Sequence, residues 1–373
     1  MKRNLFLLGL AVAAMTSCTN DEVLEQAQPT QKAIGFESFV NKETRAVTET
    51  DNDITKFYAY GYYNQGTNSG ETVFTGTEVS RTSTSSTEWT YDLNAETDGN
   101  QVAYWTKNIY QFAGYANGNS ASELTGVSFS NVSTTDNGST TNTPTLKIQD
   151  YTVSDDNDLV AGLTSVDNRN AIKSSEPVSF TFQHLLSKVK FTVINNDDKY
   201  KMRITSPLTI SGVKTIGTCT VTSAGANWTS EEDAETNDNF VPVAATAAGT
   251  YIPINTGNEI PSDEYFVLPH QTLSDVVTFA ITAEFYDDNN QVVATKTFSG
   301  KTIVNNTVPP ANSNESPVSV AQWQPGYVYN YIISLPTAAK PIVFGDISVV
   351  EDWTSGGTIE LNPNDDGTGG TSN

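Results

Sequence analysis

The sequence has few residues of the types that build most catalytic centres. Its 373 residues include two cysteines, Cys18 and Cys219, and two histidines, His184 and His270. No HExxH helix, CxxC pair, GxSxG elbow, phosphate-binding loop or dinucleotide fingerprint occurs. Two cysteines are too few for a disulfide framework, and Cys219 is expected to be a small buried strand residue. We therefore expect no enzymatic activity, no cofactor and no metal site.

Acidic clusters are the only pattern that suggests a cation. Asp156 and Asp158 in "DDNDLVAG" lie two positions apart, but Ala161 stands where an EF-hand turn needs glycine. These clusters are interpreted as solvated loops. His184, beside two leucines, is expected to be a packing or hydrogen-bonding residue, and His270, after a proline, a turn residue.

Basic residues are scarce as well. Twenty lysines and arginines stand against 43 acids, which gives a net charge of −23. This charge repels phosphate backbones and anionic membrane surfaces, so nucleic acid is not an expected partner. An acidic surface is typical of a secreted or surface protein that must stay soluble.

Only one long apolar run occurs, from Leu5 to Met15, and it follows Lys2 and Arg3. Eleven residues are too few to span a bilayer as a helix, so residues 1–17 are interpreted as a signal peptide. The "MTSC" that ends at Cys18 resembles a bacterial lipoprotein cleavage box. This resemblance implies that Cys18 becomes the first mature residue and carries a lipid. The alternative is a plain secretory signal.

The rest of the chain favours β-structure. Threonine, serine, asparagine, glycine and tyrosine are abundant, and only 17% of residues are charged. In "ITKFYAYGYYN", Phe57 and Ala59 alternate with Tyr58 and Tyr60, as the two faces of a strand require. Many short segments of this kind predict an all-β protein of β-sandwiches, and the length favours two domains.

The sequence predicts the local structure of three segments. "FQHLLSKV" could form one helical turn, with Phe182, Leu185 and Leu186 on one face, and we place the domain boundary there. The polar stretch 131–145 is expected to be an exposed connection, and "YDDNNQ" at 286–291 a hairpin turn. The domains are therefore expected at 46–184 and at 185–373, the second with a flexible tail.

Several motifs follow one another in the order found in the fimbrillin family of Bacteroidetes, the subunits of protease-assembled (type V) pili. The matching residues are Tyr104, Trp105, Phe112, Ala113 and Tyr115; Asp158 and Leu159; Phe182, His184, Leu186, Lys188 and Val189; and Trp323, Pro325, Gly326, Tyr331, Ile342, Phe344, Val349 and Trp353. Leu185 and Ser187 stand where the family motif has alanine. The resemblance implies two transthyretin-like Greek-key β-sandwiches in series.

The resemblance also implies that the exported precursor is cut after an arginine by a trypsin-like surface protease. The matching bond lies between Arg45 and Ala46, so residues 18–45 would form a propeptide. Within it, Ile34, Phe36 and Val40 could share one face of a strand. Removing that strand would expose unpaired backbone groups and an apolar surface that another chain's strand can cover.

The donor of such a strand is expected at the C-terminus of a neighbouring chain. The candidate residues are Val349, Trp353, Ile359 and Leu361. Whether this region instead completes its own sandwich is open at this point.

The resemblance thus implies a structural pilus subunit at the cell surface, which starts as an outer-membrane lipoprotein and supports adhesion. Its partners would be other pilin subunits and an arginine-specific protease. The alternative is a lipid-anchored β-sandwich that binds glycans or host surfaces and never polymerises.

Overall fold

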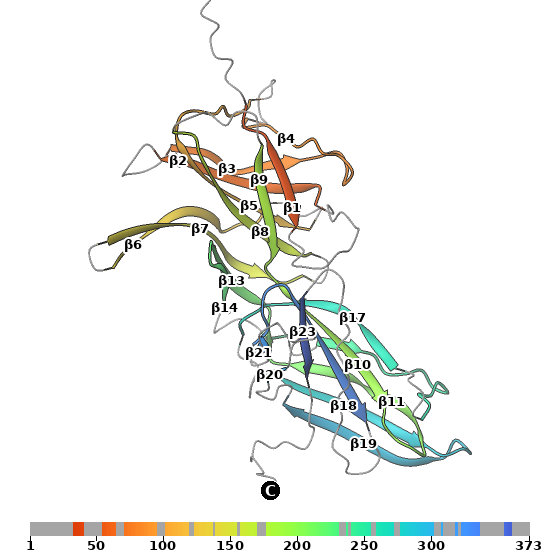
Figure 1. Ribbon diagram of the computed structural model, residues 1–373. Helices are drawn as coiled ribbons and strands as arrows, with labels where there is room; N and C mark the ends of the chain where they lie inside the picture. Colours follow the sequence, from red (N-terminus) through yellow and green to blue (C-terminus); the bar gives the residue numbers. More distant parts are fainter. Residues whose placement is uncertain are drawn as a thin grey trace, which may run out of the picture.

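The structure is a computed structural model, and every regular element among the residues that it describes is a β-strand (Figure 1). It describes residues 33–40, 54–64, 71–94, 101–118, 123–136, 139–154, 157–169, 177–230, 236–237, 240–254, 259–271, 277–301, 307–308, 318–319, 322–335 and 354–359. Within these residues, no helix is long and apolar enough to span a membrane. The expectation of an all-β protein is confirmed.

The first half of the chain is built on a seven-stranded sheet of order β1-β9-β8-β5-β2-β3-β4. Its strands are β1 (Phe36–Val40), β2 (Lys56–Asn64), β3 (Glu71–Ser80), β4 (Thr90–Tyr91), β5 (Ile109–Asn117), β8 (Leu159–Asp167) and β9 (Val178–His184). Each neighbouring pair is antiparallel except β1 and β9, which run parallel. The first strand thus joins the sheet by a different pattern from the rest.

A four-stranded sheet of order β14-β13-β7-β6 covers one face of the seven-stranded sheet (Figure 1). It consists of β6 (Val127–Asp136), β7 (Ser139–Thr152), β13 (Ile216–Thr222) and β14 (Gly225–Ser230). β13 and β14 follow the predicted boundary at residues 184 and 185, yet β13 pairs with β7 from the first half. The predicted division therefore does not separate the strands cleanly.

Two further four-stranded sheets form the second half of the chain. One has the order β17-β10-β22-β23, with β10 (Ser187–Asn195), β17 (Glu259–Val267), β22 (Tyr327–Leu335) and β23 (Thr354–Ile359). The other has the order β16-β11-β18-β19, with β11 (Lys201–Ser211), β16 (Phe240–Val243), β18 (Thr278–Tyr286) and β19 (Val292–Lys301). Two short pairs complete the fold, β12 (Val213–Lys214) with β15 (Thr236–Asn237), and β20 (Thr307–Val308) with β21 (Val318–Ser319).

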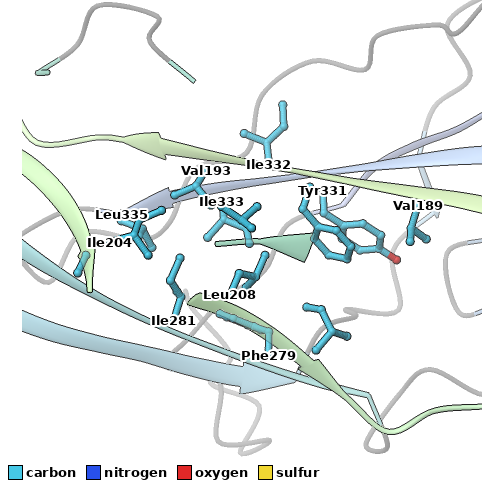
Figure 2. Close-up of a cluster of buried hydrophobic side chains, with 14 of the residues drawn as sticks. Val189, Val193, Ile204, Leu208, Phe279, Ile281, Tyr331, Ile332, Ile333 and Leu335 are labelled. Carbon is cyan, nitrogen blue, oxygen red and sulfur yellow. The ribbon is translucent and has the colours of Figure 1, made fainter. Parts of the chain in front are cut away.

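Three buried apolar clusters hold these sheets together. In the second half, Figure 2 shows Val193 of β10 and Leu335 of β22 on the side of the cluster opposite Ile281 of β18. In the first half, the seven-stranded sheet is buried on both faces: Phe57 and Ala59 belong to one cluster, and Tyr58 belongs to the other. This arrangement confirms the alternation predicted for the strand over residues 54–64.

Two local predictions were wrong. "FQHLLSKV" forms no helical turn, because β9 continues as a strand to His184 and β10 begins at Ser187. Leu185 and Leu186 are both buried because the chain bends between the two strands. Within the stretch 131–145, residues 131–136 belong to β6 and residues 139–145 to β7, and these two strands pair with Asp136 opposite Ser139. Its many threonines are β-branched and favour strands.

Two others were confirmed. Residues 286–291 connect β18 to β19, and the N–H of Asp287 donates to the carbonyl oxygen of Gln291 at 3.1 Å. Cys219 lies on β13 with its side chain fully buried.

Candidate functional site: the first strand and its aromatic cluster

The backbone of the first strand is bonded on both of its edges. On one side, β1 pairs with β9 in a register that runs from Phe36 opposite Val178 to Val40 opposite Phe182. The N–H of Val178 also donates to the carbonyl oxygen of Gly35 at 2.8 Å. On the other side, the N–H of Ile34 donates to the carbonyl oxygen of Ala103 at 2.8 Å. Segments from distant parts of the sequence therefore hold β1 in place.

Tyr91 of β4 closes the site around Ile34. Its hydroxyl donates to the carbonyl oxygen of Ile34 at 2.8 Å and accepts from the N–H of Ala103 at 3.2 Å. Burial raises the pKa of Tyr91 to about 12, so the hydroxyl keeps its proton and remains a donor at neutral pH. Because β4 and β1 are the two edges of the seven-stranded sheet, these contacts show that the sheet curls until its edges meet.

Phe36 lies at the centre of a group of aromatic rings. Ile34 and Phe36 are 1% and 5% exposed, respectively. The ring centroid of Phe36 lies 5.2–6.4 Å from five others, which belong to Phe57, Phe74, Tyr91, Phe112 and Phe180. Four of the five contacts are edge-to-face, a favoured geometry for aromatic pairs. We call these six residues the Phe36 cluster.

Close packing around the cluster depends on glycine at one position of β2. A Cβ atom added to Gly61 would lie 2.7 Å from Cδ1 of Phe112 and 3.0 Å from Cδ2 of Phe74. The first contact is shorter than real Cβ atoms make and the second is unusually tight, so glycine lets both rings approach the strand. The cluster is therefore shaped by backbone as well as by side chains.

The structure brings together only part of the predicted removable strand. Ile34 and Phe36 enter the same apolar cluster. Val40 pairs through its backbone with Phe182, and its side chain lies outside the described residues. Cys18, Arg45 and Ala46 also lie outside them.

The predicted donor region is described only in part. β23 pairs in parallel with β22 of the same chain, and Ile359 is opposite Tyr331. Thus the segment that contains Ile359 extends a sheet of its own second half. Val349, Trp353 and Leu361 lie outside the described residues.

The two histidines take part in structural contacts, as their sequence neighbours indicated. His184 Nδ1 lies 2.6 Å from Asp158 Oδ2. His270 lies in a turn, where its Nδ1 accepts from the N–H of Trp228 at 3.1 Å and its Nε2 contacts Gln324 Oε1 at 3.1 Å. Among the described residues, no group of three or more histidine, cysteine, aspartate or glutamate side chains could hold a metal ion.

Sequence reasoning missed the part of the site that faces β1 from β4. Tyr91 belongs to "EWTYDL", in which Trp89 and Tyr91 alternate with polar residues. That alternation is the signal of a short strand with an aromatic face. The sequence does not show that this face meets Ile34 and Phe36.

Comparisons with known proteins place this fold in a family. A sequence model of the fimbrillin-like family matches residues 44–353, which is most of the chain. The matched range begins after β1. No curated protein matches the chain in sequence.

Several solved structures are similar to this chain. A candidate cell adhesion protein from Bacteroides uniformis is 17% identical, with a TM-score of 0.41, over 88% of this chain and 100% of that one. One from Bacteroides ovatus is 13% identical, with a TM-score of 0.44, over 87% and 98%. The fimbrial anchor protein Mfa2 from Porphyromonas gingivalis is 10% identical, with a TM-score of 0.28, over 71% and 82%. On the family match over residues 44–353, the chain belongs to the fimbrillin-like family.

Proposed function

We propose that this protein is a structural subunit of a cell-surface pilus that polymerises after β1 is removed, and that it supports adhesion. Membership of the fimbrillin-like family supports a pilus-associated role of a structural, non-enzymatic kind. The observation that carries the finer proposal is the position of Phe36, a residue of the first strand that fills the centre of an aromatic cluster built by later strands.

A protease cut between Arg45 and Ala46 would separate β1 from the body of the fold. β1 ends at Val40 and β2 begins at Lys56, so the cut falls in the connection between them. After the cut, only non-covalent contacts would hold β1. These include the backbone bonds of Ile34 and Gly35 and the burial of Ile34 and Phe36.

Loss of β1 would leave a vacancy that only another strand can fill well. The parallel edge of β9 and the carbonyl oxygen of Ala103 would lose their partners. An exposed strand edge of this kind is a template for an added strand. Each apolar side chain that enters the vacancy contributes about 1.5–3 kcal/mol before ordering costs. Burial of the same surface would thus drive polymerisation.

The incoming strand would come from the C-terminal region of a neighbouring chain, where Val349, Trp353, Ile359 and Leu361 are candidates. It would run parallel to β9, as β1 does. Ile359 lies on β23, which already pairs with β22. A donor that uses Ile359 must therefore release that pairing first.

Export supplies the remaining steps of the proposal. Lipid on Cys18 would hold the precursor at the outer membrane, and an arginine-specific surface protease would cut it free of the propeptide. The cut chain would then join other pilin subunits, including anchor and tip subunits, in an extracellular fimbria.

Aromatic residues support this proposal over the glycan-binding alternative. The largest fully buried side chains are tyrosines and phenylalanines, which fill the cores. Among the described residues, Tyr104 is the only exposed aromatic ring, at 47%, and one ring does not form a sugar-stacking surface. The cores account for most of the aromatic residues that the structure describes, without a ligand.

Brief trypsin treatment of the lipid-free precursor tests the proposal. The matched control is the double variant Lys42→Gln/Arg45→Gln, because trypsin also cuts after lysine and Lys42 likewise follows β1. We expect N-terminal sequencing to find Ala46 and unheated gels to show ladders of oligomers for the wild type alone. A wild-type chain that is cut after Arg45 and stays monomeric would refute polymerisation. Resistance at Arg45 would refute the processing step.

A further inference from the structure

A short segment near the C-terminus repeats the sequence pattern of the segment that contributes Ile34 and Phe36 to the core. Residues 32–36 read "KAIGF", and residues 340–344 read "KPIVF", so lysine, isoleucine and phenylalanine recur at the same spacing. Three positions after each phenylalanine comes another apolar residue, Phe39 in the first copy and Ile347 in the second. Isoleucine two positions before phenylalanine occurs nowhere else in the chain.

We infer that residues 340–347 of a neighbouring chain occupy the site that β1 fills in this structure. The inference rests on the proposed function, because β1 must leave before another segment can enter. It goes further by naming the occupant, its register and its direction. The occupant lies earlier in the chain than the four candidates Val349, Trp353, Ile359 and Leu361. The likeness ends before Val40, whose counterpart is Ser348.

The buried positions of the site match the residues that the two copies share. Ile342 takes the position of Ile34, and Phe344 takes that of Phe36, the two side chains that are almost fully buried. The Phe36 cluster surrounds one ring with five others, and a phenylalanine reproduces this packing without a change in volume.

The position of Ala33 accepts the proline of the second copy. Ala33 forms an isolated bridge with Tyr104, and the bond to Ala103 comes from the N–H of the next residue, Ile34. Proline lacks an N–H, but Pro341 leaves the N–H of Ile342 free to make the same bond.

The position of Gly35 accepts a side chain. A Cβ atom added there would meet only Cβ of Pro177, at 3.9 Å, which is an ordinary van der Waals contact. Gly35 also lacks the positive φ that would exclude a branched residue. Val343 therefore has room for its Cβ. Both differences between residues 32–36 and residues 340–344 thus fall where the site tolerates them.

The register of β1 fixes a direct test by disulfide cross-linking. Glu37 is opposite Ser179 on β9, and the counterpart of Glu37 is Gly345. We therefore combine Ser179→Cys with Gly345→Cys in the lipid-free chain that begins after Cys18. The matched control combines Ser179→Cys with Thr354→Cys, which faces residue 179 if Trp353 takes the place of Phe36. Cys219 is buried and does not interfere.

After trypsin treatment and mild oxidation, we expect denaturing gels without reductant to show a ladder for the Gly345→Cys pair only. Uncut chains should show no ladder. Cross-links through Thr354→Cys, without cross-links through Gly345→Cys, would overturn the inference while leaving polymerisation intact.

A peptide separates failure of the inference from failure of polymerisation. A labelled peptide of residues 338–349, present in excess during cleavage so that neighbouring chains have not yet filled the vacated site, should bind the trypsin-cut chain, as measured by fluorescence anisotropy. Its Phe344→Ala version should bind more than 100-fold more weakly, since truncating a buried phenylalanine is among the costliest core changes. A cut chain that stays monomeric yet binds the peptide would refute the proposed polymer alone. A chain that polymerises to the same extent whether or not excess peptide is present during cleavage would refute the inference alone.

Discussion

Replacing Phe36 with alanine tests whether the first strand contributes to the stability of the uncut fold. The ring is 5% exposed and contacts rings from β2, β3, β4, β5 and β9. Because these rings belong to separate strands of one sheet, they cannot all move to fill the space. We expect the free energy of unfolding to fall by about 3–5 kcal/mol, the range for a buried phenylalanine truncated to alanine.

Equilibrium unfolding in guanidinium chloride, followed by tryptophan fluorescence, measures this loss. Trp105 lies in the larger buried apolar cluster that contains Phe36, so its fluorescence reports on the packing there. Glu37→Ala is the matched control, because Glu37 lies on the same strand but is only half-buried. We expect the control to change stability by less than about 0.5 kcal/mol.

The wild type and Phe36→Ala should have the same free energy of unfolding after cleavage at Arg45 and removal of the propeptide, because residue 36 is then absent from both chains. A loss below about 1 kcal/mol in the uncut chain would refute the packing argument. A difference that persists in the cut chain would show that β1 had not been removed.

Three further predictions concern other parts of the fold. Gly162→Ala should destabilise the chain by about 1–3 kcal/mol in thermal unfolding, because the added Cβ would lie 2.6 Å from the carbonyl oxygen of Thr181. Gly35→Ala is the control and should be nearly neutral. Equal effects of the two substitutions would contradict this prediction. Hydrogen bonds from Tyr286 and Arg203 hold the pKa of Glu284 below its ordinary value of 4.5. The contribution of Glu284 is therefore complete above that value and is lost as pH falls through the folded pKa. Melting curves of wild type and Glu284→Gln should converge in acid, and a constant difference down to low pH would refute this. Burial raises the pKa of the Cys219 thiol, so Ellman's reagent should react only as fast as the chain unfolds; rapid labelling under native conditions would contradict the burial.

Local patterns were enough to predict the strands and the faces of their side chains. The alternation of Phe57 and Ala59 with Tyr58 predicted a strand with two faces, and in the structure both faces are buried. Ile34 and Phe36 share a face for the same reason, since a strand repeats every two residues. Such predictions succeed because they depend on neighbours in the sequence.

Features that depend on distant partners could not be predicted in this way. Nothing near Phe36 shows that β9 is its parallel partner or that Tyr91 closes the other side. Leu185 and Leu186 suggested a helical turn because two adjacent apolar residues break the period of a strand. In the structure, a bend places both in one core. The bend itself depends on the strands before and after it.

The return of β13 and β14 to the first half has a mechanical consequence. The chain passes between the two halves from β9 to β10, again from β12 to β13, and once more after β14. The indole N–H of Trp228 on β14 also donates to the carbonyl oxygen of Leu185 at 2.6 Å. Domains joined by one linker swing freely unless their interface is large and apolar. Here a pulling force spreads over several covalent connections, so the two halves should respond to tension as a single stiff rod.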